Sequence, residues 1–289
     1  MKIAIISNPK KYEVKEVLAS TLTWAKENNI SLFMSAAAFQ ENDIQEDTFL
    51  HRTDSDQESI KQADIVLVMG GDGTILYTAR ISKDEGKPIL GINSGRLGFM
   101  ANTQKEDLEQ ALNYLLNKNY TLDKRSFLKA KDSEGNEFHA LNEFLFTRKS
   151  STSMVNISAE YDGHLINTYW ADGLIVASPT GSTAYNLASG GPIISPDTDV
   201  FCVTPINPHT LTTRPLVLNS NRPLKVTLED QETEVLFSFD GQAQEIKKLP
   251  FQVEIIKSEL TFNLIHLPGQ DYFETLRKKL MWGMDSRRV

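Results

Sequence analysis

"VLVMGGDGTILYTAR", residues 66–80, places a glycine-rich turn between an apolar run and a segment with helical spacing. Its glycines, Gly70, Gly71 and Gly73, allow positive φ and a close approach of the backbone to a ligand. The helix that follows directs N–H groups and its positive dipole end toward the turn, which favours an anion there. Asp72 stands inside this turn, although a carboxylate repels phosphate. It is therefore either a plain turn residue or a residue with a task beside a phosphate.

The turn differs from the two common phosphate-binding fingerprints. It lacks the lysine and adjacent Ser or Thr of a P-loop, and its glycine spacing is not GxGxxG. In phosphoryl transfer, however, an aspartate beside the phosphates accepts the proton of the attacking hydroxyl. Asp72 is thus a candidate general base, with a tight strand-to-helix turn as the alternative.

The rest of the chain divides into two textures. Through about residue 120, short β-rich runs alternate with helical patterns, which predicts an α/β domain with a parallel sheet and flanking helices. Within it, Thr103 and Glu106 have the spacing of a capping box ahead of a helix over 103–117. From 121 to 266, alternating strands and the Asp-Gly pairs at 162–163 and 240–241 predict a mainly antiparallel β domain with hairpins. Residues 267–289 return to helical spacing, and we expect this C-terminal helix to pack back on the first domain.

Composition excludes several classes of protein. The 289 residues include 30 basic and 38 acidic side chains, a net charge of -8 that gives no long-range attraction to nucleic acid or to an anionic membrane. Cys202 is the single cysteine, so disulfides within the chain and thiolate metal clusters are excluded. No apolar run approaches the roughly 20 residues of a membrane span. The five histidines show no ligand spacing such as HExxH, so we expect no protein metal site. The single cysteine fits a reducing setting, so we expect a cytoplasmic location.

A second motif, "ADGLIVASPTGSTAYNLASGGPII", covers residues 171–194. An apolar strand runs into Pro179, residues 180–183 offer hydroxyls and N–H groups at a helix start, and "GGP" ends the helix. Such hydroxyls are often plain helix caps. Taken alone, this stretch does not separate a cap from a binding site.

The motifs gain meaning from their order. The sequence "GGDGT", then "LNEFLF", the 171–194 stretch, "NPHTLTTRPLVL" and "SFDGQ" closely resembles the NAD kinases of the bacterial type. The resemblance runs from Asp64 to about Gln242. "GGDGT" alone is shared with diacylglycerol-kinase-like enzymes, whereas the 171–194 stretch is far more specific. The resemblance to NAD kinases implies transfer of the terminal phosphoryl group of ATP to the 2'-hydroxyl of the adenosine ribose of NAD, giving NADP.

The resemblance also implies site residues. Asp72 would be the general base, with Gly73 beside the dinucleotide, and Asp172 would hold the nicotinamide half. Asn142 and Glu143 would hydrogen-bond ribose hydroxyls, which makes 121–266 the NAD-binding domain. Thr183, Ala184 and Tyr185 would surround the adenosine. Asn186, Leu187 and Ala188 would lie in the same turn of helix, and Gln242 would reach the site from the β domain.

Each assignment has a plain alternative. A polar pair such as Asn142 and Glu143 is often the solvated face of a strand. Tyr185 on a short helix is often part of a core. Asp172-Gly173 and Asp240-Gly241 are also typical turns.

The implied substrates are NAD and ATP, with Mg²⁺ or another divalent metal brought by ATP. The implied partners are further copies of the same chain, as a dimer or tetramer, with no nucleic acid or membrane. Two rival functions remain: a catalytically idle sensor of NAD or NADP, and a lipid or sugar kinase that shares the "GGDGT" loop.

Among the departures from the family pattern, two remove a basic residue. Tyr77 and Trp170 stand where many members carry basic residues. Another residue must therefore offset phosphate charge. Arg80, Arg96 and Arg148 are the candidates.

Overall fold

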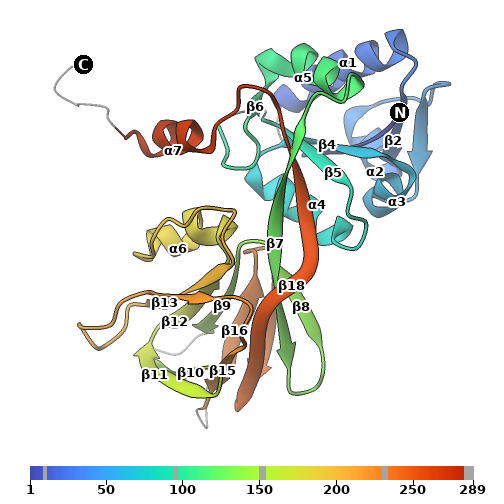
Figure 1. Cartoon of the computed structure of the whole chain (residues 1–289). Coiled ribbons are helices and arrows are strands. Elements are labelled where there is room, and N and C mark those ends of the chain that lie inside the picture. Colours follow the sequence, from blue (N-terminus) through green and yellow to red (C-terminus); the bar gives the residue numbers. More distant parts are fainter. Residues whose placement is uncertain (9–11, 94, 96, 150–153, 230–233, 283–289) are drawn as a thin grey trace. The chain divides into compact units, whose positions relative to one another are not determined.

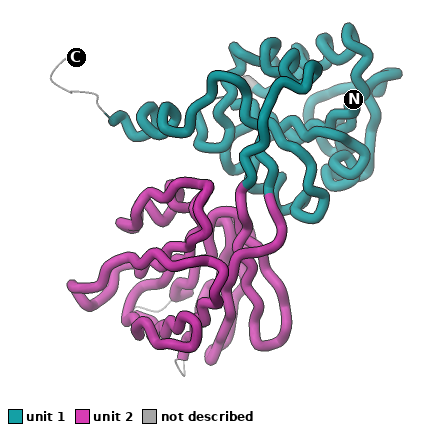
Figure 2. Tube along the Cα trace, viewed as in Figure 1, with its two compact units in different colours: residues 1–124, 262–289 teal, residues 125–261 magenta. Residues whose placement is uncertain are grey.

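The computed structural model describes residues 1–8, 12–93, 95, 97–149, 154–229 and 234–282. The chain forms two compact units, residues 1–124 with 262–289 and residues 125–261 (Figure 2). The strands β7 (Thr121–Asp132) and β18 (Phe251–His266) each contribute residues to both units.

The first unit contains a parallel sheet with strand order β5-β4-β1-β2-β3 (Figure 1). Its strands are β1 (Lys2–Ser7), β2 (Ser31–Ser35), β3 (Leu50–Thr53), β4 (Ile65–Gly70) and β5 (Pro88–Asn93). The end of β18 and the short β6 (Thr103–Gln104) each pair with β5, also in parallel. Every residue of β4 is buried, as expected for a strand covered on both faces of a parallel sheet.

Helices cover this sheet. They are α1 (Tyr12–Glu27), α2 (Ala36–Asn42), α3 (Asp56–Gln62), α4 (Asp72–Ser82) and α5 (Leu108–Leu116), with a 3-10 turn η1 (Lys105–Asp107) before α5. Alternate residues of β1 and β4, among them Ile5 and Leu67, join one apolar cluster with α1 and α5. Helices α3 and α4 pack together and against the sheet. The predicted α/β domain is confirmed.

The predicted capping box is wrong. Thr103 lies in β6, where it pairs with Ile92, and α5 begins only at Leu108. The Thr103 hydroxyl accepts a hydrogen bond from the Gln270 side chain at 3.0 Å instead of capping a helix. Strand pairing and a partner distant in sequence have therefore overridden the local pattern.

The C-terminal helix α7 (Tyr272–Leu280) belongs to the first unit, as predicted. The Asp271 side chain caps its start by accepting the N–H groups of Phe273 and Glu274. Its residues Thr275 and Leu276 are buried. Gln270, just before the helix, connects this end of the chain to β6.

The second unit is mainly antiparallel, as predicted. One sheet of this unit has the strand order β14-β13-β12-β9-β16-β17. A second group of antiparallel strands has the order β11-β10-β15 and ends with the start of β18. The first sheet consists of β9 (Glu143–Arg148), β12 (Gly173–Ala177), β13 (Val200–Ile206), β14 (Leu216–Asn219), β16 (Glu234–Phe239) and β17 (Ala243–Lys248). The remaining strands are β8 (Glu137–Ala140), which pairs with β7, and β10 (Val155–Tyr161), β11 (His164–Ala171) and β15 (Leu224–Leu228). Apolar residues of these strands form one core cluster.

Both Asp-Gly pairs form the predicted hairpin turns. The pair at 162–163 joins β10 to β11, and the pair at 240–241 joins β16 to β17. All four residues have positive φ, between 52° and 80°. Asp-Gly suits such turns because aspartate tolerates the left-handed region and glycine has no Cβ.

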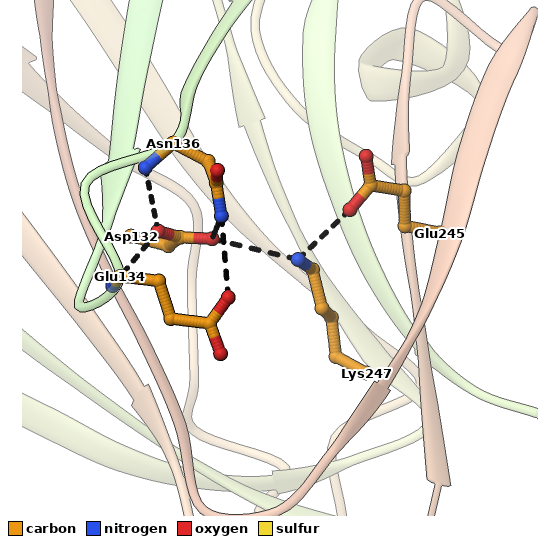
Figure 3. A network of polar contacts seen from close by, with 5 residues as sticks. All are labelled: Asp132, Glu134, Asn136, Glu245 and Lys247. Atoms are coloured by element: carbon orange, nitrogen blue, oxygen red, sulfur yellow. Dashed lines mark hydrogen bonds and ion pairs between the residues drawn. The ribbon is translucent and has the colours of Figure 1, made fainter.

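A buried ion pair connects the β7–β8 turn to β17 (Figure 3). The Asp132 carboxylate accepts the backbone N–H groups of Glu134 and Asn136, and Lys247 Nζ lies 3.4 Å from Asp132 Oδ2 and 2.8 Å from Glu245 Oε2. Burial raises the pKa of Asp132, but hydrogen bonds from Asn136, Glu134 and Lys247 bring it below its ordinary value. The Lys247 ammonium also lies 5.3 Å from the ring centres of both Phe138 and Phe251.

We predict that Lys247→Met destabilises the second unit by about 1–3 kcal/mol, because it leaves the Asp132 charge buried with fewer partners. Lys248→Met is the matched control, because Lys248 directly follows Lys247 in the sequence and its side chain is exposed. Urea unfolding of both variants at neutral pH measures the difference. Equal unfolding midpoints for the two variants would show that the ion pair contributes nothing.

Candidate functional site

The glycine turn lies between β4 and α4, at the carboxyl end of a parallel strand, where ligands of such sheets bind. Gly71 is the N-cap of α4 with φ -113°, and Gly70, Gly71 and Gly73 are all absent from the residues with positive φ. The freedom of glycine to adopt positive φ is therefore not used here, because the chain passes from extended backbone directly into the helix. Close approach does apply: a Cβ on Gly70 would lie 2.3 Å from Thr74 Oγ1, whereas one on Gly73 would meet nothing within 4 Å.

The Asp72 carboxylate holds a neighbouring loop. Phe99 N–H donates to Oδ2 at 2.9 Å, and the N–H groups of Met100 and Ala101 each donate to Oδ1 at 3.0 Å. A Cβ on Gly98 would lie 2.2 Å from Oδ1, so the loop fits closely around the carboxylate. A carboxylate offers about four acceptor positions. Among the described residues three are filled, and one position on Oδ2 is left for a hydroxyl donor.

Asn142 and Glu143 lie at the start of β9 and are buried, with 7% and 6% of each residue exposed. They are not the solvated face of a strand. The Asp240 carboxylate accepts their N–H groups at 2.6 and 3.3 Å, and that of Leu141 at 2.9 Å. Asp240 is therefore more than a turn residue: it fixes the backbone that carries the polar pair.

The 171–194 motif is locked to the same backbone. Ser178 N–H donates to the Asn142 carbonyl at 2.8 Å, and the Ser178 hydroxyl donates to the Leu141 carbonyl. A Cβ on Gly181 would lie 2.1 Å from the Asn142 carbonyl oxygen, so only glycine permits this contact. The fold thus brings "LNEF", "SPTGST" and the Asp240 turn together within the second unit.

The remaining residues of the motif divide by exposure. The short η2 (Thr180–Thr183) and α6 (Tyr185–Ala188) carry them. Tyr185 is 44% exposed and so is not core packing. Ala188 is exposed too, while Thr183, Ala184 and Leu187 are half-buried.

Asn186 differs, because its side chain is completely buried and fully engaged. Its amide donates to the carbonyls of Ser182 and Pro192, and its Oδ1 accepts the Thr204 hydroxyl at 2.6 Å. This side chain holds the 182–192 loop together. Asn186 therefore acts on the conformation of this loop.

Asp172 lies where the chain passes from β11 to β12. Its Oδ1 is 3.1 Å from an Arg148 guanidinium nitrogen, and its Oδ2 accepts the Asn207 amide at 3.1 Å.

Nearby on β11, the exposed Trp170 ring lies 4.9 Å from the His209 ring. Gln242 is exposed at the tip of the β16–β17 hairpin, where its N–H donates to the Phe239 carbonyl.

The candidates for the missing positive charge are placed as follows. Arg148 pairs with Asp172. Arg80 is exposed in the last turn of α4, about 12 Å along the helix from Asp72. Arg96 lies outside the described residues. Tyr77 points to α3, where its hydroxyl donates to Asp56 at 3.0 Å; burial and the Asp56 charge raise the pKa of Tyr77 to about 12.

One cation was missed by the sequence reading. Lys279, on α7, places its ammonium 5.4 Å from the ring centre of Phe99, whose N–H binds Asp72. The only sequence signal is the basic run at 277–279. Nothing in the local pattern connects that run to the glycine turn.

Comparison with known proteins agrees with this picture. The model of the ATP-NAD kinase N-terminal domain matches residues 3–120, and that of the ATP-NAD kinase C-terminal domain matches residues 141–267. An NAD kinase of Flavobacterium psychrophilum is 36% identical over 99% of this chain and 100% of its own length. An NAD kinase of Cytophaga hutchinsonii is 39% identical over 83% of this chain and 81% of its own.

Two solved structures share the fold. The yeast NADH kinase complexed with NADH has a TM-score of 0.91 at 22% identity, covering 100% of this chain and 90% of that one. An NAD kinase from Archaeoglobus fulgidus in complex with ATP has a TM-score of 0.75 at 24% identity, covering 97% and 99%. With both family models matched in order along the sequence, the chain belongs to the NAD kinase family.

Proposed function

We propose that this protein transfers the terminal phosphoryl group of ATP to the 2'-hydroxyl of the adenosine ribose of NAD, producing NADP and ADP. The observation that carries the proposal is the Asp72 carboxylate at the start of α4. Three backbone N–H groups orient it, and one acceptor position on Oδ2 stays available among the described residues. A general base needs this combination of fixed direction and an open position within reach of a hydroxyl.

In the proposed step the ribose 2'-oxygen attacks the terminal phosphorus of ATP. The bond between that phosphorus and the bridging oxygen breaks, ADP leaves, and the hydroxyl proton passes to Asp72 Oδ2. Positioning supplies much of the acceleration in phosphoryl transfer. The three N–H donors serve that purpose, since they prevent the carboxylate from rotating away.

NAD binding is proposed for the residues that the resemblance implies. Asn142 and Glu143 would bind ribose hydroxyls, and Asp172 the nicotinamide half. The residues proposed to surround the adenosine or to complete the site are Gly73, Thr183, Ala184, Tyr185, Leu187, Ala188 and Gln242. Asn186 would contribute by holding their loop, because its own amide is satisfied inside the protein.

Among the described residues, no group of three or more His, Cys, Asp or Glu side chains is placed to hold a metal ion. We propose that Mg²⁺ or another divalent cation enters bound to the phosphates of ATP, where it would neutralise their charge. No helix in the described part of the chain is long and apolar enough to cross a membrane. Assembly as a homo-dimer or tetramer remains a prediction from the resemblance.

The first test is NADP formation by the wild type and by Asp72→Asn, with ATP, Mg²⁺ and NAD. Loss of a general base lowers turnover on the order of 10²–10⁴-fold. The asparagine amide would also face the Phe99 N–H, and losing that hydrogen bond costs about 1.5–3 kcal/mol. A protein with the usual stability of about 5–15 kcal/mol stays mostly folded after such a loss. We therefore expect nearly complete loss of turnover with NAD binding retained.

Three outcomes contradict this reading. Unchanged turnover of Asp72→Asn would remove Asp72 from the proposed role. A wild type that binds NAD tightly but forms no NADP would instead be a sensor, and weak NAD binding would favour a lipid or sugar kinase.

We also propose that Lys279 offsets part of the phosphate charge, because it lies over Phe99 in the loop that holds Asp72. Lys279→Met should raise the KM for ATP several-fold. Lys278→Met is the control, since Lys278 pairs with Glu274 at 2.7 Å within α7. An equal KM for ATP in the two variants would refute this assignment.

A further inference from the structure

Glu143 has an environment that is unusual for a carboxyl group. Only 6% of the residue is exposed, and Oε2 is buried without a hydrogen-bond partner among the described residues. A buried carboxylate oxygen without donors is costly, whereas a neutral carboxyl group tolerates this position better. The site therefore favours a protonated Glu143.

Asp240 adds a second reason. Its carboxylate accepts three backbone N–H groups, one of them from Glu143 itself, and these donors stabilise its negative charge. Two carboxyl groups close together in a buried place do not both ionise readily. Burial first, and then the Asp240 charge, raise the pKa of Glu143 to about 8.

Among the described residues, no cation acts on the Glu143 carboxyl, whose pKa is raised by burial and by the Asp240 charge. On β12 its pairing partner is Ala177, and on the β16 side the Asp240 N–H donates to the Glu143 carbonyl at 3.1 Å. The 178–181 segment contributes hydroxyls, and the buried Arg125 lies 3.5 Å from the Thr180 hydroxyl. Among the described charged groups, Asp240 is the one that acts on the Glu143 carboxyl.

We propose that Asp240 and Glu143 form a carboxyl pair with a single negative charge, in which neutral Glu143 donates a hydrogen bond to an acceptor atom of the bound nucleotide. Asp240 is then a positioning residue: it holds the 141–143 backbone and keeps Glu143 neutral. This inference rests on the proposed function. It departs from the plain expectation that Glu143 is an ionised acceptor for ribose hydroxyls, because a carboxylate accepts hydrogen bonds only and a neutral acid also donates one.

The sign of the pH effects follows. Stability contributed by neutral Glu143 is complete below its unfolded pKa of about 4.3 and is lost as pH rises to its folded pKa. NAD affinity should fall as pH rises through about 8, up to tenfold per pH unit, because ionised Glu143 loses its donor. Glu143→Gln keeps a neutral donor and should remove that fall.

The experiment begins with the free full-length protein. Carbon NMR of glutamate side chains labelled with ¹³C follows ionisation, and Glu143→Gln identifies the Glu143 signal. We expect a midpoint near 8 in the wild type. A midpoint near the ordinary value of about 4.3 would overturn the proposal, and this measurement requires no variant of Asp240 to fold.

A pair of Asp→Asn variants then assigns the cause. Asp240→Asn should shift the Glu143 midpoint to lower pH. Asp162→Asn is the matched control, since Asp162 occupies the other Asp-Gly hairpin with φ 52° and pairs with the exposed Arg222. It should leave the midpoint in place. Equal midpoints in both variants would remove Asp240 from the role.

Titration of NAD binding from about pH 6 to about pH 10, in the wild type and Glu143→Gln, completes the test. We expect affinity to fall above about pH 8 in the wild type only. A parallel fall in the variant would overturn the donor role. Absence of NAD binding at every pH would instead refute the proposed function, while the titration of the free protein would still decide the charge of Glu143.

Discussion

Each of the two units depends on the same kind of interaction, a carboxylate that accepts three consecutive backbone N–H groups. Asp72 binds the N–H groups of residues 99–101 in the first unit, and Asp240 binds those of 141–143 in the second. Irregular backbone lacks the partners that helices and sheets provide, and buried N–H groups must find others. Each aspartate meets that need for one loop, and each loop borders a proposed binding position.

The same contact has opposite chemical results in the two units. At Asp72 the donors fill both positions on Oδ1 and one on Oδ2, which leaves the carboxylate oriented with an open acceptor. At Asp240 the donors stabilise a buried negative charge, and burial of Glu143, followed by this charge, raises the pKa of Glu143 to about 8. The same backbone contact therefore supports the proposed proton acceptor in one unit and the proposed neutral hydrogen-bond donor in the other.

The sequence predicted features that depend on local chemistry. The alternating pattern predicted the α/β unit, the Asp-Gly pairs predicted both hairpins, and the glycine turn was placed correctly at the end of a strand. Features that depend on distant partners were missed. The donors to Asp72 lie 27 to 29 residues away and those to Asp240 lie 97 to 99 away, so neither clamp has a local signature. For the same reason the local pattern at Thr103 wrongly predicts a helix cap, and no local pattern predicts the ion pair of Arg148 with Asp172.

Asp72 keeps one acceptor position open among the described residues, and we propose that this position takes the adenosine 2'-hydroxyl. A crystal structure of the wild type with NAD and a non-hydrolysable ATP analogue tests it most directly. The account predicts that Asp72 Oδ2 lies about 2.6–3.2 Å from the 2'-oxygen while the N–H groups of 99–101 stay bound to the carboxylate. A complex in which Asp72 contacts only the 99–101 loop, with the 2'-hydroxyl facing another residue, would contradict the account.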